Sequence, residues 1–282
     1  MTPALKATLI AAGLAVPLIA APLAASAQSL KTGVDGTFAP HAFPTLDGKT
    51  EGFNMDLGAA LGEALGTEVE IDVTQWSGLL PGMQAGTYDF VLAPTTVTEE
   101  RAGNMIFTEP YLNTDFQFVT KKGAPEITDL KEFDGKVIAV NKGSAYDQWA
   151  RDIAGDIGWT VESYGTNLDA LQAVMSGRAF ANVAGNTNSA WAVKTNPQLQ
   201  LSYLYSTGKV FSIPLRTDNT ELRAKLDMAL ECLKESGKLA ELHEKWFGYA
   251  PAADSATATI YPGVGIPDMP GYDATEHELS CS

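Results

Sequence analysis

The chain is poor in cysteine, histidine and basic residues. It has two cysteines and three histidines, and Lys and Arg number 19 against 34 for Asp and Glu. The histidines are widely scattered, so we expect no metal site and no cofactor. The formal net charge of −15 argues against nucleic acid as a partner, because its binders need a basic face. Net charge does not select a small ligand, since a site can be locally positive within an acidic protein.

Long apolar runs are absent after residue 27, so the sequence predicts no later segment with the ~20 apolar residues of a spanning helix. The N-terminus has one such run. Lys6 precedes an apolar stretch over 7–24, and Ala25-Ser26-Ala27 supplies a small-x-small cleavage pattern. A retained membrane anchor is the alternative, but two prolines interrupt the run. We therefore predict a signal peptide over 1–27, cleaved after Ala27, and a periplasmic mature protein.

The two cysteines are Cys232 and Cys281. In an oxidising compartment a lone pair of cysteines is more often bridged than free, so we predict a disulfide between them. It would close a loop of ~50 residues, worth roughly 4 kcal/mol in the chain-entropy model. Two unpaired thiols are the alternative.

Strand and helix patterns alternate along most of the remaining chain. Residues 54–65 place apolar side chains at helical spacing after Asn54, a candidate cap, and residues 69–73 alternate as a half-buried strand does. The pattern returns between residues 116 and 193. Alternating strands and helices indicate α/β sheets, and at this length two sheets in two lobes fit better than one.

The C-terminal part has a different character. A helical pattern covers about 221–247, with a predicted break at Ser236-Gly237. The tail over 249–282 is rich in Pro, Gly, Ala and acidic residues and has no periodicity, which alone indicates a linker or disorder. Cys281 and the tyrosines of the tail favour instead a segment that wraps back over the last helices.

The stretch Thr96-Val97-Thr98-Glu99-Glu100-Arg101 has the chemistry to hold a small carboxylate. It follows an apolar strand and begins a short helix. The arginine can bind both carboxylate oxygens, and the helix start adds N–H donors and the positive end of its dipole. An ordinary helix cap with a surface arginine is the alternative.

Three further segments follow predicted strands, at the sheet edge where α/β proteins bind ligands. Asp35 and Phe38 lie in the first, Trp76 in the second, and Ser144 with Ala145 in the third, where a helix start offers free N–H groups. The alternatives are a turn with a buried Phe, a core Trp and a plain N-cap. No nucleophile with a neighbouring base and no phosphate-binding Gly-rich loop stands out.

Taken together and in this order, these segments resemble the periplasmic polar amino-acid-binding proteins of ABC transporters, bacterial extracellular solute-binding protein family three. The resemblance covers roughly residues 30–247. Its most specific parts are residues 35–40, 52–57, 76–81, 95–101, 143–144 and 239–248. It implies an α/β, two-lobed periplasmic binding protein fold (type II), each lobe a mostly parallel sheet flanked by helices, with a two-strand hinge. The lobes would be 28–112 with 211–248, and 113–210, followed by the irregular tail 249–282.

The resemblance also implies the roles of single residues. Arg101 would bind the ligand carboxylate between the aromatic walls Phe38 and Trp76. The other implied contacts are Asp35, Pro94, Thr96, Ser144 and Ala145. One departure matters: the family commonly has an aspartate that neutralises the ligand's α-ammonium, and Gly185 stands there. Either Asn186 or Asp35 would take over part of this task; a cap for the following helix is the alternative for Asn186.

These features predict an exported, monomeric binding protein, not an enzyme. It would close two lobes on a small carboxylate-bearing solute, an amino acid or derivative, and deliver it to an ABC transporter permease. A non-α-amino compatible solute or an opine is an alternative ligand, given Gly185. An enzyme on the same fold, such as a cyclohexadienyl or arogenate dehydratase, is a rival that would need acid–base groups, for which Asp35 and His41 are the nearby candidates. A sensory or adaptor protein with an empty cleft is the third possibility.

Overall fold

The structure is a computed structural model that describes residue 1 and residues 29–281. The predicted signal peptide and its cleavage site therefore lie outside the described residues. Within the described part, no helix has the length and apolar character needed to cross a membrane.

The first lobe contains a five-stranded sheet in the order β4-β1-β5-β13-β7. Its strands are β1 (Leu30–Asp35), β4 (Val69–Thr74), β5 (Phe90–Val91), β7 (Ile106–Phe107) and β13 (Pro214–Leu215). β4, β1 and β5 are parallel, whereas β13 runs antiparallel to both of its neighbours. The apolar faces of α1 (Phe53–Leu65), α8 (Thr220–Glu235) and α9 (Lys238–Phe247) pack on this sheet and form a common core with it.

A six-stranded sheet in the order β10-β9-β11-β8-β12-β6 forms the second lobe and extends through β12 to β6 in the first lobe. Its strands are β6 (Thr95–Thr96), β8 (Leu112–Lys121), β9 (Val137–Asn141), β10 (Thr160–Tyr164), β11 (Ala181–Gly185) and β12 (Leu199–Ser212). β10, β9 and β11 are parallel. β8 runs antiparallel to both of its neighbours, β11 and β12, so the sheet is mixed.

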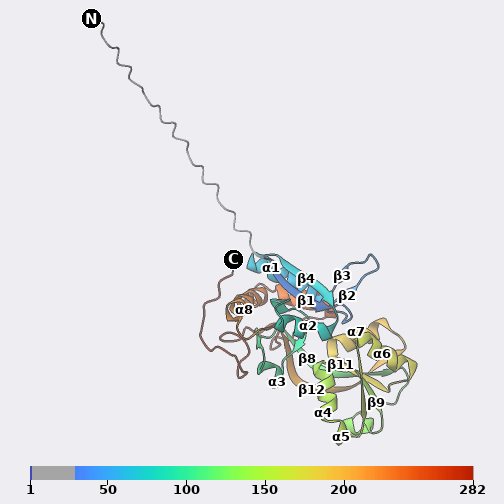
Figure 1. Cartoon of the computed structure of the whole chain (residues 1–282). Helices are drawn as coiled ribbons and strands as arrows, with labels where there is room; N and C mark the ends of the chain where they lie inside the picture. Colours follow the sequence, from blue (N-terminus) through green and yellow to red (C-terminus); the bar gives the residue numbers. More distant parts are fainter. Residues whose placement is uncertain (2–28, 282) are drawn as a thin grey trace.

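β8 and β12 connect the two lobes (Figure 1). β8 leaves the first lobe and β12 returns to it, where Phe211 and Ser212 pair with Thr96 and Thr95 of β6. The predicted lobe boundaries, after residues 112 and 210, fall inside these strands and remain our prediction. This connection brings the loops after β1 and β5 to face the loop after β9.

The remaining helices cover the sheets or flank the cleft. They are α2 (Trp76–Gln84), α3 (Glu99–Ala102), η1 (Leu130–Phe133), α4 (Ala145–Asp152), α5 (Ala154–Ile157), α6 (Asn167–Ser176) and α7 (Asn186–Thr195), and a small hairpin joins β2 (Phe43–Pro44) to β3 (Thr50–Glu51). α1 begins after Gly52, so the predicted cap, Asn54, lies inside the helix and is buried. The predicted break between the last two helices is confirmed at Gly237, which has a positive φ of 77°.

The tail returns over the last helices, as the sequence predicts (Figure 1). Ala256 N donates to Asn113 Oδ1 at 2.8 Å, and Thr257 Oγ1 donates to the carbonyl of Tyr111 at 3.0 Å. The predicted disulfide is present: Cys232 on α8 is bonded to Cys281, with Cα atoms 5.5 Å apart. The tail therefore contacts both α8 and the chain at the start of β8.

Candidate ligand-binding site

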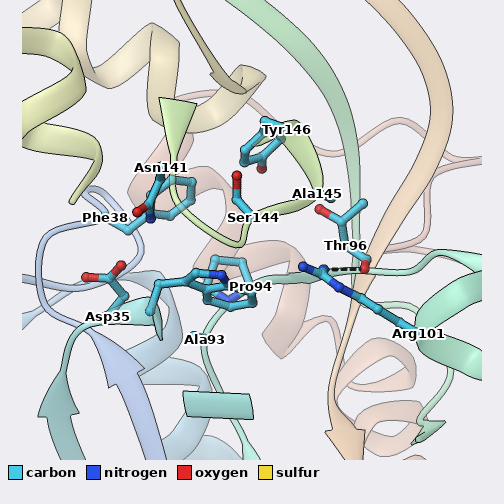
Figure 2. A pocket seen from close by; sticks show the side chains of 11 residues that line it. Asp35, Phe38, Ala93, Pro94, Thr96, Arg101, Asn141, Ser144, Ala145 and Tyr146 are labelled. Atoms are coloured by element: carbon cyan, nitrogen blue, oxygen red, sulfur yellow. Dashed lines mark hydrogen bonds between the residues drawn. The ribbon is translucent and has the colours of Figure 1, made fainter. Parts of the chain in front are cut away.

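A cavity lies between the lobes, at the carboxyl ends of the strands (Figure 2). Both lobes contribute to its wall. Eight of the predicted ligand-binding residues line it, with Ala93, Asn141 and Tyr146 in addition; the eight are Asp35, Phe38, Trp76, Pro94, Thr96, Arg101, Ser144 and Ala145. Their side chains come from segments more than 100 residues apart, which the two crossing strands bring together.

Arg101 points into this cavity from α3 (Figure 2). Thr98 caps the helix by accepting from Arg101 N at 3.2 Å, which fixes the position of the arginine backbone. The guanidinium donates from Nη1 to the Thr96 carbonyl at 2.8 Å and from Nη2 to the Gly143 carbonyl at 3.3 Å. Burial lowers the pKa of Arg101 to about 10, so the side chain stays cationic at neutral pH. Its other N–H groups leave it able to bind an anion.

Flat apolar side chains form two further walls of the cavity. Trp76 is 8 % exposed and Phe38 is 6 % exposed. The Arg101 guanidinium lies over the Trp76 ring, 5.4 Å from its centroid, and the ring Nε1 donates to the Gly143 carbonyl at 3.0 Å. Trp76 therefore supports the arginine and also touches the opposite lobe.

The second lobe contributes the N-terminus of α4. Ser144 caps this helix by accepting from Asp147 N at 3.1 Å, and Ala145 is its first residue. The first N–H groups of a helix lack intrahelical partners, and the helix dipole makes this end positive. The end of α4 therefore faces the cavity with the same sign of potential as Arg101, which suits an anionic group between them.

Asp35 lies at the end of the cavity opposite Arg101 (Figure 2). It is 3 % exposed, and its Oδ1 accepts from the backbone N of Thr37 at 2.9 Å and from its hydroxyl at 2.7 Å. The loop holds one carboxylate oxygen in this way, which leaves Oδ2 for another donor.

Two polar residues that line the cavity, Asn141 and Tyr146, were not among the predicted site residues. Asn141 ends β9, so the strand-end rule that selects Asp35 would have found it. Its Oδ1 is buried and has no hydrogen-bond partner among the described residues. Tyr146 directly follows Ser144 and Ala145 on α4, so the same segment contains it, but the direction of its side chain depends on packing against Gly185 of β11.

The structure does not bring Asn186 to this cavity. Asn186 is the first residue of α7, and its Oδ1 accepts from Asp115 N at 3.4 Å. It lines a separate hollow with residues that include Trp191 and Trp246. Its side chain turns away from the cleft because the helix begins at this residue and directs it toward β8. The proposed role of Asn186 toward the ligand therefore has no geometric support.

His41 joins the lobes beside the cavity but is not one of its lining residues. Its Nδ1 lies 2.9 Å from Asn54 Oδ1, and its Nε2 lies 2.8 Å from the Thr187 hydroxyl on the other lobe. Burial lowers the pKa of His41 to about 4, so the ring is neutral at physiological pH. Both ring nitrogens are used in these contacts, which leaves Asp35 without the imidazole partner that an acid–base mechanism would require.

We expect His41 to make the folded protein sensitive to acid. The folded state lowers the pKa of His41 below its unfolded value, so its stabilising contribution is present above the unfolded pKa and is lost as the pH falls toward 4. Between about pH 7 and about pH 5, the free energy of unfolding of the wild type should fall by about 2 kcal/mol more than that of His41→Gln. Urea unfolding at the two pH values measures this loss.

His277 provides the control. A hydrogen bond to Glu231 raises the pKa of His277, so its contribution is full at low pH and is lost as the pH rises through the folded pKa. His277→Gln should therefore leave the acid loss as large as in the wild type or larger. Equal acid losses in the wild type and His41→Gln would contradict the assignment.

Two lobes, two crossing strands and a charged cavity between them define a protein that encloses a small solute. The chain belongs to the bacterial extracellular solute-binding proteins, family 3, whose profile matches residues 30–249. It is a solute-binding protein of the transport class and not an enzyme.

Relatives in sequence are binding proteins of amino-acid transport. The chain is 28 % identical over 255 residues to the L-arginine-binding protein of Pseudomonas aeruginosa, covering 87 % of this chain and 98 % of that protein. It is 30 % identical over 227 residues to the L-cystine-binding protein TcyJ of Escherichia coli (strain K12), covering 78 % of this chain and 83 % of that protein.

Solved structures confirm the two-lobed fold. An ancestral arginine-binding protein bound to arginine has a TM-score of 0.75 and 35 % identity, over 78 % of this chain and 98 % of that one. The ancestral amino acid-binding protein AncCDT-1, a precursor of cyclohexadienyl dehydratase, has a TM-score of 0.72 and 29 % identity, over 78 % of this chain and 95 % of that one. The family match ends at residue 249, so the tail lies beyond it.

Proposed function

We propose that this protein captures a small carboxylate-bearing solute, an amino acid or a derivative, and delivers it to the permease of an ABC transporter. The observation that carries this proposal is Arg101, a cation directed into an enclosed cavity and faced by the N-terminus of α4. Relatives named as arginine- and cystine-binding proteins support the class of ligand. The protein would act as a monomer in the periplasm after cleavage behind Ala27.

Capture would occur in two steps. The first lobe binds the solute through Arg101 and Trp76, and closure then adds Ser144 and Ala145 from the second lobe. Contacts between the lobes surround the cavity, for example Asn188 Nδ2 to the Ala39 carbonyl at 2.6 Å. A ligand favours the closed form only through contacts that it makes with both lobes, so both lobes contribute to selectivity.

Native mass spectrometry of the purified protein tests the proposal, because a solute buried between the lobes stays bound to the protein under gentle ionisation. We expect a mass increment that matches a small carboxylate, and a rise in apparent melting temperature when that compound is added in excess. The absence of any stabilising carboxylate in a broad thermal-shift screen would contradict the proposal. If size-exclusion chromatography gave the mass of a dimer, this would contradict the predicted monomeric state but not the proposed function.

A further inference from the structure

The cavity carries opposite charges at its two ends. Among its lining residues, Arg101 is the one cation and Asp35 the one anion. Figure 2 shows them at opposite ends, with Pro94 and Ala93 between them. A solute that satisfies both ends must therefore carry its negative and positive groups apart from each other.

In the wall beside Arg101, none of the residues that line the cavity is anionic. Gly185 ends β11, and a Cβ there would lie 2.8 Å from Tyr146 Oη and 3.3 Å from both Thr114 Oγ1 and Phe211 Cζ. The Tyr146 hydroxyl thus fills the space that a side chain at 185 would need. Burial raises the pKa of Tyr146 to about 12, so the phenol is neutral.

This wall disfavours an α-ammonium. An α-amino acid whose carboxylate binds Arg101 places its ammonium one carbon away, in a buried environment of neutral groups. A buried charge without a counter-charge is costly, whereas a solute that lacks this ammonium avoids the cost.

The opposite end of the cavity is rich in hydrogen-bond acceptors. Asp35 has Oδ2 available, since Thr37 occupies Oδ1. Asn141 is 3 % exposed, lines the cavity, and has a buried Oδ1 with no partner among the described residues. The Phe38 ring lies at the same end, as Figure 2 shows, and its face can receive a cation. A guanidinium or an ammonium supplies the donors that both oxygens require.

We propose that the site selects carboxylates that carry a cationic group at the far end of the molecule and no α-ammonium, that is, ω-guanidino and ω-amino acids. This inference rests on the proposed function, in which Arg101 binds the carboxylate. It adds that Asp35 and Asn141 bind the distal cation, and that the pair Tyr146 and Gly185 removes the subsite for an α-amino group.

Calorimetric titration of the full mature chain, freed of bound solute by unfolding and refolding, tests the inference with matched pairs. The probes are δ-guanidinovalerate against L-arginine and ε-aminocaproate against L-lysine, which differ only by the α-amino group. We expect the deaminated member of at least one pair to bind about tenfold tighter or more than its parent. Valerate, which lacks the distal cation, should bind more weakly than either deaminated probe.

Two variants separate the ends of the cavity. Asp35→Asn should weaken δ-guanidinovalerate about tenfold or more without weakening valerate, whereas Asp47→Asn, in an exposed loop, should change neither affinity. Tyr146→Ala combined with Gly185→Asp clears the hydroxyl and adds a carboxylate, and should shift the preference toward L-arginine. The titrations of the wild-type protein test the inference even if this double variant does not fold.

The outcomes distinguish the two proposals. The inference is overturned if L-arginine and L-lysine both bind as tightly as their deaminated partners, or if the site binds other carboxylates but none of these four probes; both results leave the proposed function intact. A wild-type protein that binds no carboxylate at all overturns the proposed function itself, whereas carboxylate binding that persists unchanged in Arg101→Ala overturns the role of Arg101.

Discussion

Arg101→Ala should weaken binding of the carboxylate solute by about a thousandfold or more. Truncating one partner of a buried, hydrogen-bonded charge pair costs about 2–5 kcal/mol or more, much of it from leaving the other charge unpaired. Here the loss also removes the guanidinium contact to the Gly143 carbonyl across the cleft, so closure is weakened as well. Calorimetric titration with the solute found by native mass spectrometry measures the effect.

The fold should survive this change. Both carbonyls that Arg101 contacts face the cavity, so water can replace the lost donors, and the free energy of unfolding should change by less than about 1 kcal/mol. Arg101→Lys keeps the charge but not the two-pronged donor geometry, so we expect an intermediate affinity. Lys142→Ala, an exposed cation beside the cleft, is the matched control and should bind normally. Normal binding by Arg101→Ala would remove the basis of the site.

Lys234→Met should destabilise the protein by about 3–5 kcal/mol, because it leaves the Glu109 carboxylate buried and unpaired. The Lys234 and Glu109 side chains are 0 % and 2 % exposed, and Nζ lies 2.8 Å from Oε1. Nζ also donates to the carbonyls of Pro110 and Thr259, both at 2.7 Å. The pair thus lies between α8, the chain that leads into β8, and the tail, and urea unfolding measures the loss.

A second substitution should restore much of that stability. Glu109→Gln combined with Lys234→Met removes both charges, and such double replacements are often far less costly than either single one. Lys225→Met, on the same helix in an exposed pair with Glu221, should change stability by less than about 1 kcal/mol. Equal losses in Lys225→Met and Lys234→Met would contradict the stabilising role of this buried ion pair.

Much of the site could be predicted because it follows a local rule. Ligands of α/β sheets bind at the carboxyl ends of strands; Asp35 and Thr96 end β1 and β6, and Trp76 and Ser144 lie shortly after β4 and β9. The helix break at Gly237 could also be predicted from a local signal, because a glycine readily adopts the positive φ that ends one helix before the next begins. The disulfide followed from having two cysteines in a chain with a predicted export signal.

Other features depend on neighbours that are distant in the sequence. The direction of Asn186 depends on where α7 begins relative to β8. The neutral wall beside Arg101 arises because the Tyr146 hydroxyl from α4 fills the space over Gly185 on β11. Neither contact has a periodicity or spacing that a single sequence displays.

By itself, the sequence determined the alternation of strands and helices and the arginine at a helix start, and it predicts the export signal, since each is encoded in neighbouring residues. Only the tertiary structure decided that one end of the cavity offers Asp35 and Asn141 and the other offers Arg101 without an acidic lining residue beside it. The physical reason is that charge compensation inside a cavity depends on distances between side chains from both lobes, and those distances are set by packing and by the crossing strands.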